Sequence, residues 1–113
     1  MNFSGGRQND HIIVTLHSGR AVAAIAEELK QFIRSLIDQE TAPKLIIDFS
    51  AVDFVDSSML GALLSIYKHL NTIKGQMVLC GMKSEVRQTF EITQLYKVFK
   101  IADNTETAKL RFL

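Results

Sequence analysis

The sequence lacks most of the features that mark secreted, membrane and nucleic-acid-binding proteins. It has a single cysteine, Cys80, which excludes an internal disulfide and a cysteine-based metal cluster. Its 13 basic and 12 acidic residues leave a net charge of +1, too small to favour nucleic acid or an anionic membrane. No stretch approaches the roughly 18 unbroken apolar residues of a membrane span. We therefore expect a cytoplasmic protein that binds neither nucleic acid nor membrane.

Hydrophobic periodicity predicts an α/β fold. A β-branched strand at 11–17 is followed by a helix over 22–37 with its apolar residues on one face. Further strands are expected at 44–49, 76–80 and 98–101, and further helices at 58–73, from 84 and from 104 to near 113. This alternation predicts a mixed, mostly parallel central sheet of four to five strands with about four helices. The chain is expected to form a single domain over 1–113, with 1–10 either flexible or a weak edge strand.

Several single residues carry local predictions. Gly75 follows Lys74 and is expected in the left-handed conformation that ends a helix. Gly61 lies inside a predicted helix, where glycine costs up to about 1 kcal/mol against alanine, so we expect close packing against the sheet or a partner. Ser84 is expected as a helix N-cap, and Cys80 as a buried strand thiol.

The stretch from Asp56 to Gly61 is the most informative part of the chain. It follows a buried strand and opens a helix, so it lies at the edge of the sheet where α/β folds display functional groups. Free backbone N–H groups and the helix dipole favour negative charge there. Either Asp56 or Ser57 could cap the helix, which is worth about 1 kcal/mol. The pattern alone leaves three roles for the serine pair: capping, nucleophilic attack and acceptance of a phosphoryl group.

The enzymatic interpretations have little support. The Gly-x-Ser-x-Gly pattern of a nucleophile elbow is absent around Ser57, and no glycine-rich phosphate loop occurs. His69 lies about three turns further along the same helix, too far to act as a base for Ser57. Asp48, Asp53 and Asp56 could surround Mg²⁺, but no second acidic strand end supports that site. A hydrolase or phosphatase is the least favoured alternative.

The run from Leu45 to Gly61 resembles the core of STAS domains, specifically those of bacterial anti-sigma factor antagonists. The segments 74–81 and 86–99 follow the same family pattern, and the likeness covers about residues 11–110. The resemblance implies a STAS-like fold with no catalytic activity, cofactor or bound metal. It implies that the protein binds a serine-kinase anti-sigma factor and that this kinase phosphorylates Ser57. A metal-dependent serine phosphatase would then remove the phosphate and restore the unmodified form.

The resemblance also implies a partner-binding surface. In that reading Asp56 presents Ser57 and Ser58 completes the cap. The residues expected to meet the partner are Asp53, Asp56, Ser57, Ser58, Met59, Gly61 and Arg20.

Two positions depart from the family pattern. Met59 replaces the usual glycine, so its side chain is expected to narrow access to Ser57 or to contact a partner. Val22 replaces the acid that usually precedes the first helix. These departures favour the alternative of an unphosphorylated scaffold or accessory subunit in a stress-sensing or transport complex.

Overall fold

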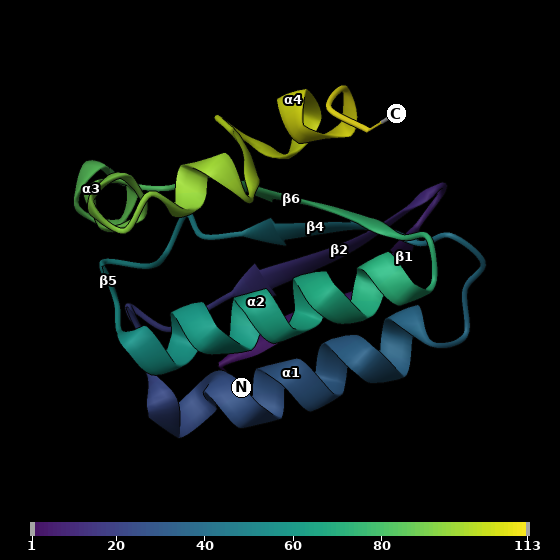
Figure 1. Ribbon diagram of the computed structural model, residues 1–113, viewed down its shortest axis with the longest axis horizontal. Coiled ribbons are helices and arrows are strands. Elements are labelled where there is room, and N and C mark those ends of the chain that lie inside the picture. The colour runs from purple at the N-terminus through teal and green to yellow at the C-terminus, as the bar shows by residue number, and fades with distance from the viewer. Residues whose placement is uncertain (1, 113) are drawn as a thin grey trace.

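A five-stranded sheet forms the centre of the computed structural model, which describes residues 2–112 (Figure 1). Its spatial order is β1-β2-β4-β6-β7. The strands are β1 (Phe3–Gln8), β2 (His11–Leu16), β4 (Lys44–Asp48), β6 (Gln76–Cys80) and β7 (Lys100–Ala102). Only β1 runs antiparallel to its neighbour, whereas the other three pairings are parallel. The predicted mixed, mostly parallel sheet is confirmed.

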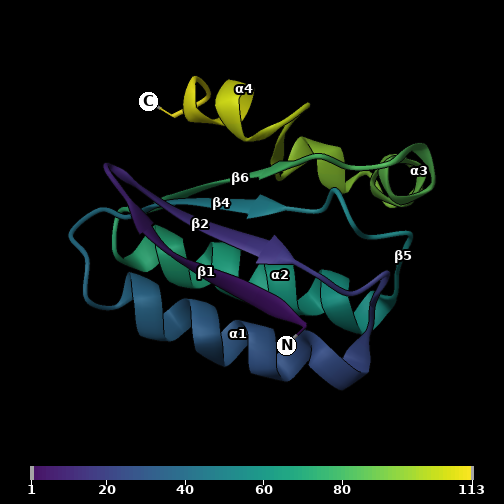
Figure 2. The same cartoon turned by 180° about the vertical axis from the view of Figure 1, so that it is seen from behind.

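The helices cover the sheet unevenly. Figures 1 and 2 show α1 (Ala23–Ile37) and α2 (Ser57–Thr72) side by side on one face, with α4 (Thr105–Lys109) over the other. The remaining helix, α3 (Ser84–Ile92), lies beyond one end of the strands. In β4, Leu45 and Ile47 belong to the core cluster under α1 and α2, while Ile46 belongs to the cluster under α4. Burial on both faces explains why this strand is apolar without alternation.

The N-terminal segment is an ordered edge strand rather than a flexible stretch. Residues Phe3–Gln8 pair with β2 along their whole length, although Met1 lies outside the described residues. A Cβ on Gly5 would lie 2.5 Å from the carbonyl oxygen of Ile13 and 2.9 Å from the Cα of Val14. The missing side chain of Gly5 therefore lets β1 approach β2 closely. The presence of glycine in the sequence does not by itself show whether a segment is flexible or closely packed.

Two short strands were not anticipated from the sequence. β3 (Arg20–Ala21) and β5 (Phe54–Val55) form a separate parallel pair that joins the segment before α1 to the segment before α2. The pairing is supported by two backbone hydrogen bonds to the carbonyl of Gly19, from the N–H groups of Asp53 and Phe54. The starts of α1 and α2 are thus fixed relative to each other.

Both glycine predictions need correction. At the end of α2 the left-handed residue is Lys74, with φ 59°, and not Gly75. Gly75 is needed for space instead, because a Cβ there would lie 2.6 Å from Cδ2 of Leu70. A Cβ on Gly61 would meet no atom within 4 Å, so close packing of this position against the sheet is wrong.

The last third of the chain differs from prediction mainly at element ends. The 3₁₀ helix η1 (Leu95–Lys97) precedes β7, so this strand begins at Lys100 and not at 98. Helix α4 ends at Lys109 rather than near Leu113, and the N-cap of α3 is Lys83 rather than Ser84. The expected cap at Asn104 is confirmed, because its side chain accepts from the N–H of Thr107 at 2.9 Å.

The prediction of a buried thiol in β6 is also confirmed. Cys80 has no exposed surface and lies in the core cluster beneath α4. Burial, and secondarily the carboxylate of Asp48, raise the pKa of Cys80 to about 12. The thiol is therefore protonated at neutral pH and behaves as a small apolar group.

Candidate functional site

One carboxylate caps two helices at the end of the molecule where α1 and α2 begin. Asp56 is the N-cap of α2, and its Oδ1 accepts a hydrogen bond from the backbone N–H of Met59 at 2.9 Å. Its Oδ2 accepts from the N–H of Ala23, the first residue of α1, at 3.1 Å. Val22, the N-cap of α1, supplies no side-chain hydrogen bond. Asp56 therefore supplies the side-chain cap of α1 that Val22 cannot provide.

Ser57 and Ser58 are the first two residues of α2, and both are exposed. Within residues 2–112 neither hydroxyl makes a hydrogen bond, so Asp56 alone caps the helix and the expected contribution of Ser58 is not seen. The backbone N–H groups of the two serines are also without partners in this part of the chain, as is usual for the first turn of a helix. An accessible hydroxyl thus lies beside two free N–H groups and the positive end of a helix dipole.

An exposed aromatic side chain borders the serines. Phe54 in β5 is 45% exposed, and the Cζ atom of Arg20 in β3 lies 4.5 Å from the centroid of its ring. The short β3–β5 pairing creates this contact, because it places Arg20 opposite Phe54. Such a cation–π pair stabilises an exposed site by about 0.5–1 kcal/mol. The contact keeps an apolar ring at the surface beside the start of α2.

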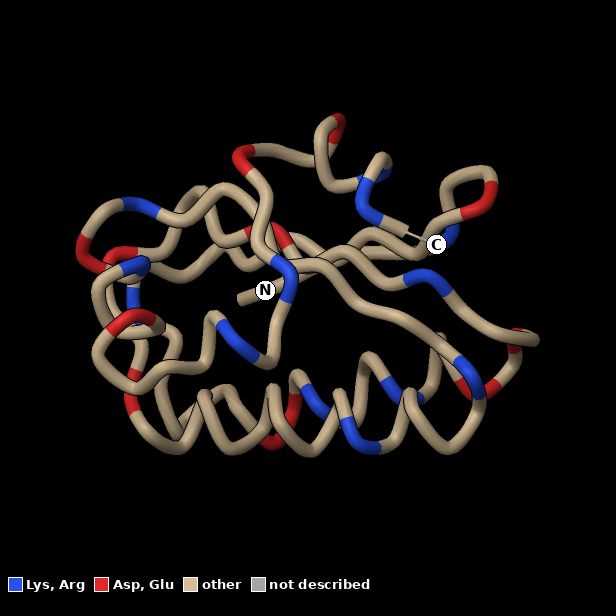
Figure 3. Tube along the Cα trace, turned by 45° about the horizontal axis from the view of Figure 1, so that its top comes forward, with Lys and Arg blue, Asp and Glu red and all other residues tan. Residues whose placement is uncertain are grey.

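Asp53 takes part in a surface ion pair rather than in a carboxylate cluster. Its Oδ1 lies 2.6 Å from Nζ of Lys83, the residue that caps α3. Both side chains are well exposed, so the pair adds little stability but fixes their orientation. Figure 3 shows that basic and acidic residues are both distributed along the chain.

The structure brings together most of the predicted site residues. Asp53, Asp56, Ser57, Ser58 and Arg20 all lie on β3, on the first turn of α2 or on the segment that leads into it. Sequence reasoning missed Phe54 and Lys83, and the signal for Phe54 was an aromatic residue beside an exposed turn.

The two remaining predicted residues have different environments. Gly61 lines a shallow hollow between α1 and α2, together with Ser58 and Ala23. Met59 is fully buried in the core, so its side chain neither narrows access to Ser57 nor reaches the surface. Met59 is therefore not part of the exposed surface around Ser57.

The described residues offer no partner for acid–base chemistry at Ser57. His69 lies near the other end of α2, where its Nε2 is 2.6 Å from Oδ1 of Asp38. Asp48 accepts from the N–H of Ser50 at 2.9 Å. Over residues 2–112, no group of three or more histidine, cysteine or acidic residues is arranged to hold a metal ion. In the same range, no helix has the length and apolar character needed to span a membrane.

The order of strands and helices and the sequence together place the chain in a known class of domain. The sequence matches the STAS domain family over residues 7–108, and the chain belongs to that family. BtrV of Bordetella bronchiseptica, named as a candidate anti-sigma factor antagonist, is 28% identical over 103 residues, which cover 91% of this chain and 88% of BtrV. The anti-sigma-B factor antagonist of Listeria monocytogenes is 31% identical over 85 residues, covering 62% and 75% of the two chains.

Solved structures show the same fold. Unphosphorylated SpoIIAA, an anti-sigma factor antagonist, superimposes with a TM-score of 0.80 at 22% identity, over 96% of this chain and 92% of SpoIIAA. The phosphorylated form of SpoIIAA, a Bacillus cell fate determinant, gives a TM-score of 0.72 at 22% identity, with coverage of 96% and 97%. The chain therefore has the fold of a protein that exists in both forms.

Proposed function

We propose that this protein is an anti-sigma factor antagonist that binds a serine-kinase anti-sigma factor and is released when the kinase phosphorylates Ser57. The observation that carries the proposal is the exposed hydroxyl of Ser57 at the first position of α2, beside an Asp56 that is held by two backbone N–H groups. The names of the curated relatives and the phosphorylated form of SpoIIAA support it. The protein would act as one cytoplasmic domain.

The electrostatics at Ser57 favour a switch that leaves the fold intact. The first turn of α2 contains no acidic residue, and its free N–H groups would donate hydrogen bonds to phosphate oxygens. A phosphoserine would add about −1.5 to −2 charges beside Asp53 and Asp56. Because Asp56 is already tied to both helices, this charge would change the surface rather than the packing beneath it. Bound partner atoms would then face a new, strongly hydrated anion.

The unmodified surface has the features of a docking site for a protein. Phe54 offers an apolar ring, Arg20 offers a cation, and the hollow at Gly61 gives room for a partner side chain. Aromatic and arginine side chains supply much of the binding energy at interfaces of this kind. A metal-dependent serine phosphatase would return the protein to this state. Since the described residues offer Ser57 no oriented base, the protein itself is proposed to have no enzymatic activity.

Phosphorylation with the cognate kinase and ATP tests the proposal. Mass spectrometry should find one phosphate on Ser57, and Ser57→Ala should abolish it. Ser58→Ala is the matched control, because it removes the adjacent exposed hydroxyl and should leave the modification intact. Ser57→Asp should weaken kinase binding without any loss of helical circular dichroism.

Two other results would reject the switch. If no phosphate appears, or if Ser57→Ala is modified as well as the unaltered chain, Ser57 is not the acceptor. Partner binding that is indifferent to both Ser57→Ala and Ser57→Asp would favour the unphosphorylated scaffold or accessory role instead.

A further inference from the structure

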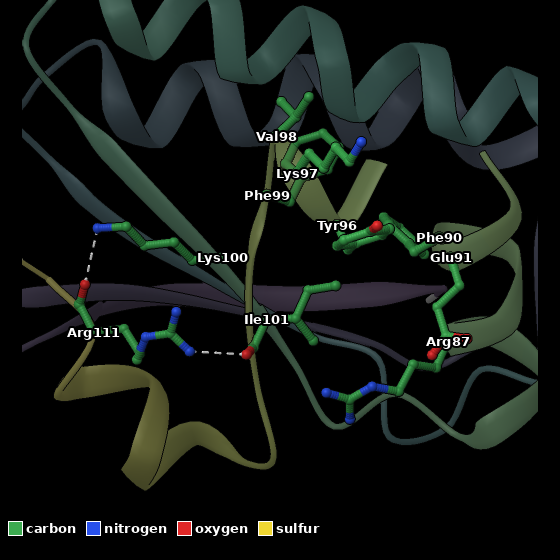
Figure 4. A pocket seen from close by; sticks show the side chains of 10 residues that line it. All are labelled: Arg87, Phe90, Glu91, Tyr96, Lys97, Val98, Phe99, Lys100, Ile101 and Arg111. Atoms are coloured by element: carbon green, nitrogen blue, oxygen red, sulfur yellow. Dashed lines mark hydrogen bonds between the residues drawn. The ribbon is translucent and has the colours of Figure 1, made fainter. Parts of the chain in front are cut away.

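A second concave site lies away from the serines, where α3, η1 and β7 meet the segment that follows α4 (Figure 4). The hollow has a volume of about 730 Å³. That volume falls within the roughly 300–1,000 Å³ of typical small-molecule sites. None of the residues proposed to meet the kinase lines it.

The lining is strongly basic. Four cationic side chains, Arg87, Lys97, Lys100 and Arg111, face one carboxylate, that of Glu91. Four positive charges less those of Glu91 and of Asp103, which pairs with Arg87, leave +2 at the hollow, whereas the whole chain carries only +1. The excess positive charge of the protein is thus concentrated in one place, which raises the local concentration of anions.

Most of these cations have no counter-charge. Over residues 2–112, the only ion pair formed by the four is that of Arg87 with Asp103, at 3.8 Å. Elsewhere, some basic side chains do have an acidic partner, as Lys83 has Asp53 and Lys30 has Glu27. An anion from outside the chain would therefore relieve repulsion here without first displacing a carboxylate.

Neutral backbone groups hold two of the cations in place. Nζ of Lys100 donates to the carbonyl oxygen of Arg111 at 3.1 Å, and Nη1 of Arg111 donates to the carbonyl oxygen of Ile101 at 3.0 Å. These bonds orient the positive groups but leave their charge uncompensated. Each group also keeps further N–H donors for a ligand.

The rest of the wall is apolar and combines aromatic residues with the aliphatic Val98 and Ile101. Phe90 and Phe99 are buried and pack edge to face, with ring centroids 6.0 Å apart, and the half-exposed Tyr96 also lines the hollow. Figure 4 shows Lys100 and Arg111 on one side of Ile101, with Phe90 and Tyr96 on the other. The hollow therefore has a cationic side and an aromatic side.

We propose that this hollow binds a small organic anion, namely a phosphate or carboxylate attached to an aromatic or apolar body. The charged group would lie against Lys100 and Arg111, and the body against Tyr96 and the rings beneath it. Glu91 and Arg87 on the aromatic side would select for ligands that carry a hydrogen-bonding group on the body. The site goes beyond the proposed partner switch and does not depend on Ser57.

Titration with phenyl phosphate, followed by amide chemical shifts of the isotope-labelled protein, tests the site. Saturable shifts should concentrate in residues 87–101 and around 111. Phenyl phosphate should bind about tenfold more tightly than inorganic phosphate or phenol, because only the complete probe meets both sides of the hollow. Ser57→Ala should bind phenyl phosphate as tightly as the unaltered chain. The test of this site is therefore independent of whether Ser57 is phosphorylated.

Two charge-matched variants sharpen the test. Lys100→Gln should weaken phenyl phosphate binding about tenfold by removing a charge-assisted contact. Arg34→Gln, an exposed position on α1, removes the same charge and should leave the affinity unchanged. An unchanged melting temperature would show that Lys100→Gln still folds.

Three outcomes would overturn the proposal. They are the absence of saturable shifts, equal affinity for phenyl phosphate and inorganic phosphate, and equal weakening by Lys100→Gln and Arg34→Gln. The last result would mean that net charge alone attracts the probe.

Discussion

The carboxylate of Asp56 accepts a hydrogen bond from the backbone N–H of Ala23, 3.1 Å away and 33 residues earlier in the chain. Through its other oxygen, the same carboxylate caps α2 at Met59. A residue beside the proposed phosphoacceptor thus stabilises the N-termini of both long helices. This arrangement explains how α1 begins at a valine N-cap without a capping side chain of its own.

Replacing Asp56 should therefore cost more than the loss of one cap. Asp56→Ala removes both acceptors, and we expect a loss of about 1–3 kcal/mol in the free energy of unfolding. Asp56→Asn keeps one carbonyl oxygen for Met59 but can present an amide donor to Ala23, so its loss should be smaller. Urea denaturation measures both variants. If Asp56→Asn were as stable as the unaltered chain, the bond to Ala23 would contribute nothing.

Gly61 should be a position where stability and binding conflict. Nothing lies within 4 Å of a Cβ at this helical site, so Gly61→Ala should raise the free energy of unfolding by about 0.5–1 kcal/mol. Gly75→Ala is the contrasting variant and should be destabilising, because its Cβ would lie 2.6 Å from Leu70. Thermal unfolding measures both. If the hollow at Gly61 receives a partner side chain, Gly61→Ala should also weaken kinase binding; unchanged affinity would remove Gly61 from the interface.

The adjacent glycines of β1 offer a paired test of the edge strand. Gly5→Ala places a Cβ 2.5 Å from the carbonyl oxygen of Ile13, which should force β1 away from β2. Gly6→Ala meets no atom within 4 Å and should be neutral or slightly stabilising. Amide hydrogen exchange of residues 3–8 should accelerate in the first variant only. Equal exchange rates in the two variants would contradict the close approach of β1 to β2.

Cys80 should make stability fall at alkaline pH. Burial raises the pKa of Cys80 from 9.0 to about 12 in the folded protein. Between these values the unfolded chain releases the thiol proton while the folded chain keeps it, so rising pH favours unfolding. The stabilising contribution is complete below pH 9.0 and is lost as the pH approaches about 12.

Cys80→Ala provides the control for this pH dependence. From urea denaturation between about pH 8 and pH 11, the free energy of unfolding should fall more steeply for the unaltered chain than for the variant. The thiol should also resist Ellman's reagent at pH 8 until the protein is unfolded. Parallel slopes in the two proteins would show that the thiol is not protected.

The order of elements followed from periodicity because most strands and helices bury a continuous apolar face. The β4 strand was predictable because both of its faces are apolar and buried, with Leu45 and Ile47 on one face and Ile46 on the other. The β3–β5 pair could not be predicted in this way, since two residues carry no period. Residues whose role depends on space, such as Gly5 and Gly75, also needed coordinates, because composition does not separate flexibility from close approach.

Some features of the candidate site could likewise be predicted from the sequence, and others could not. The exposed Ser57 and a cap at either Asp56 or Ser57 could be predicted, because helix N-termini have local sequence signatures, and the structure decides for Asp56. The burial of Met59 could not, since an apolar residue in the first turn can face a partner or the core, and only the path of the helix decides. The contact of Asp56 with Ala23 joins residues far apart in sequence, and no local pattern reports it.

Within the first turns of α2, some residues would be constrained by partner binding and others by packing in the core. Ser57, Ser58 and Gly61 face outward, whereas Met59 and Leu60 belong to the core. Under the proposed function, duplicated genes could therefore diverge at outward positions around Ser57, such as Ser58, and acquire different kinases while the core residues of their products stayed the same. Insulation between parallel signalling circuits in one cell would then need only a handful of surface substitutions.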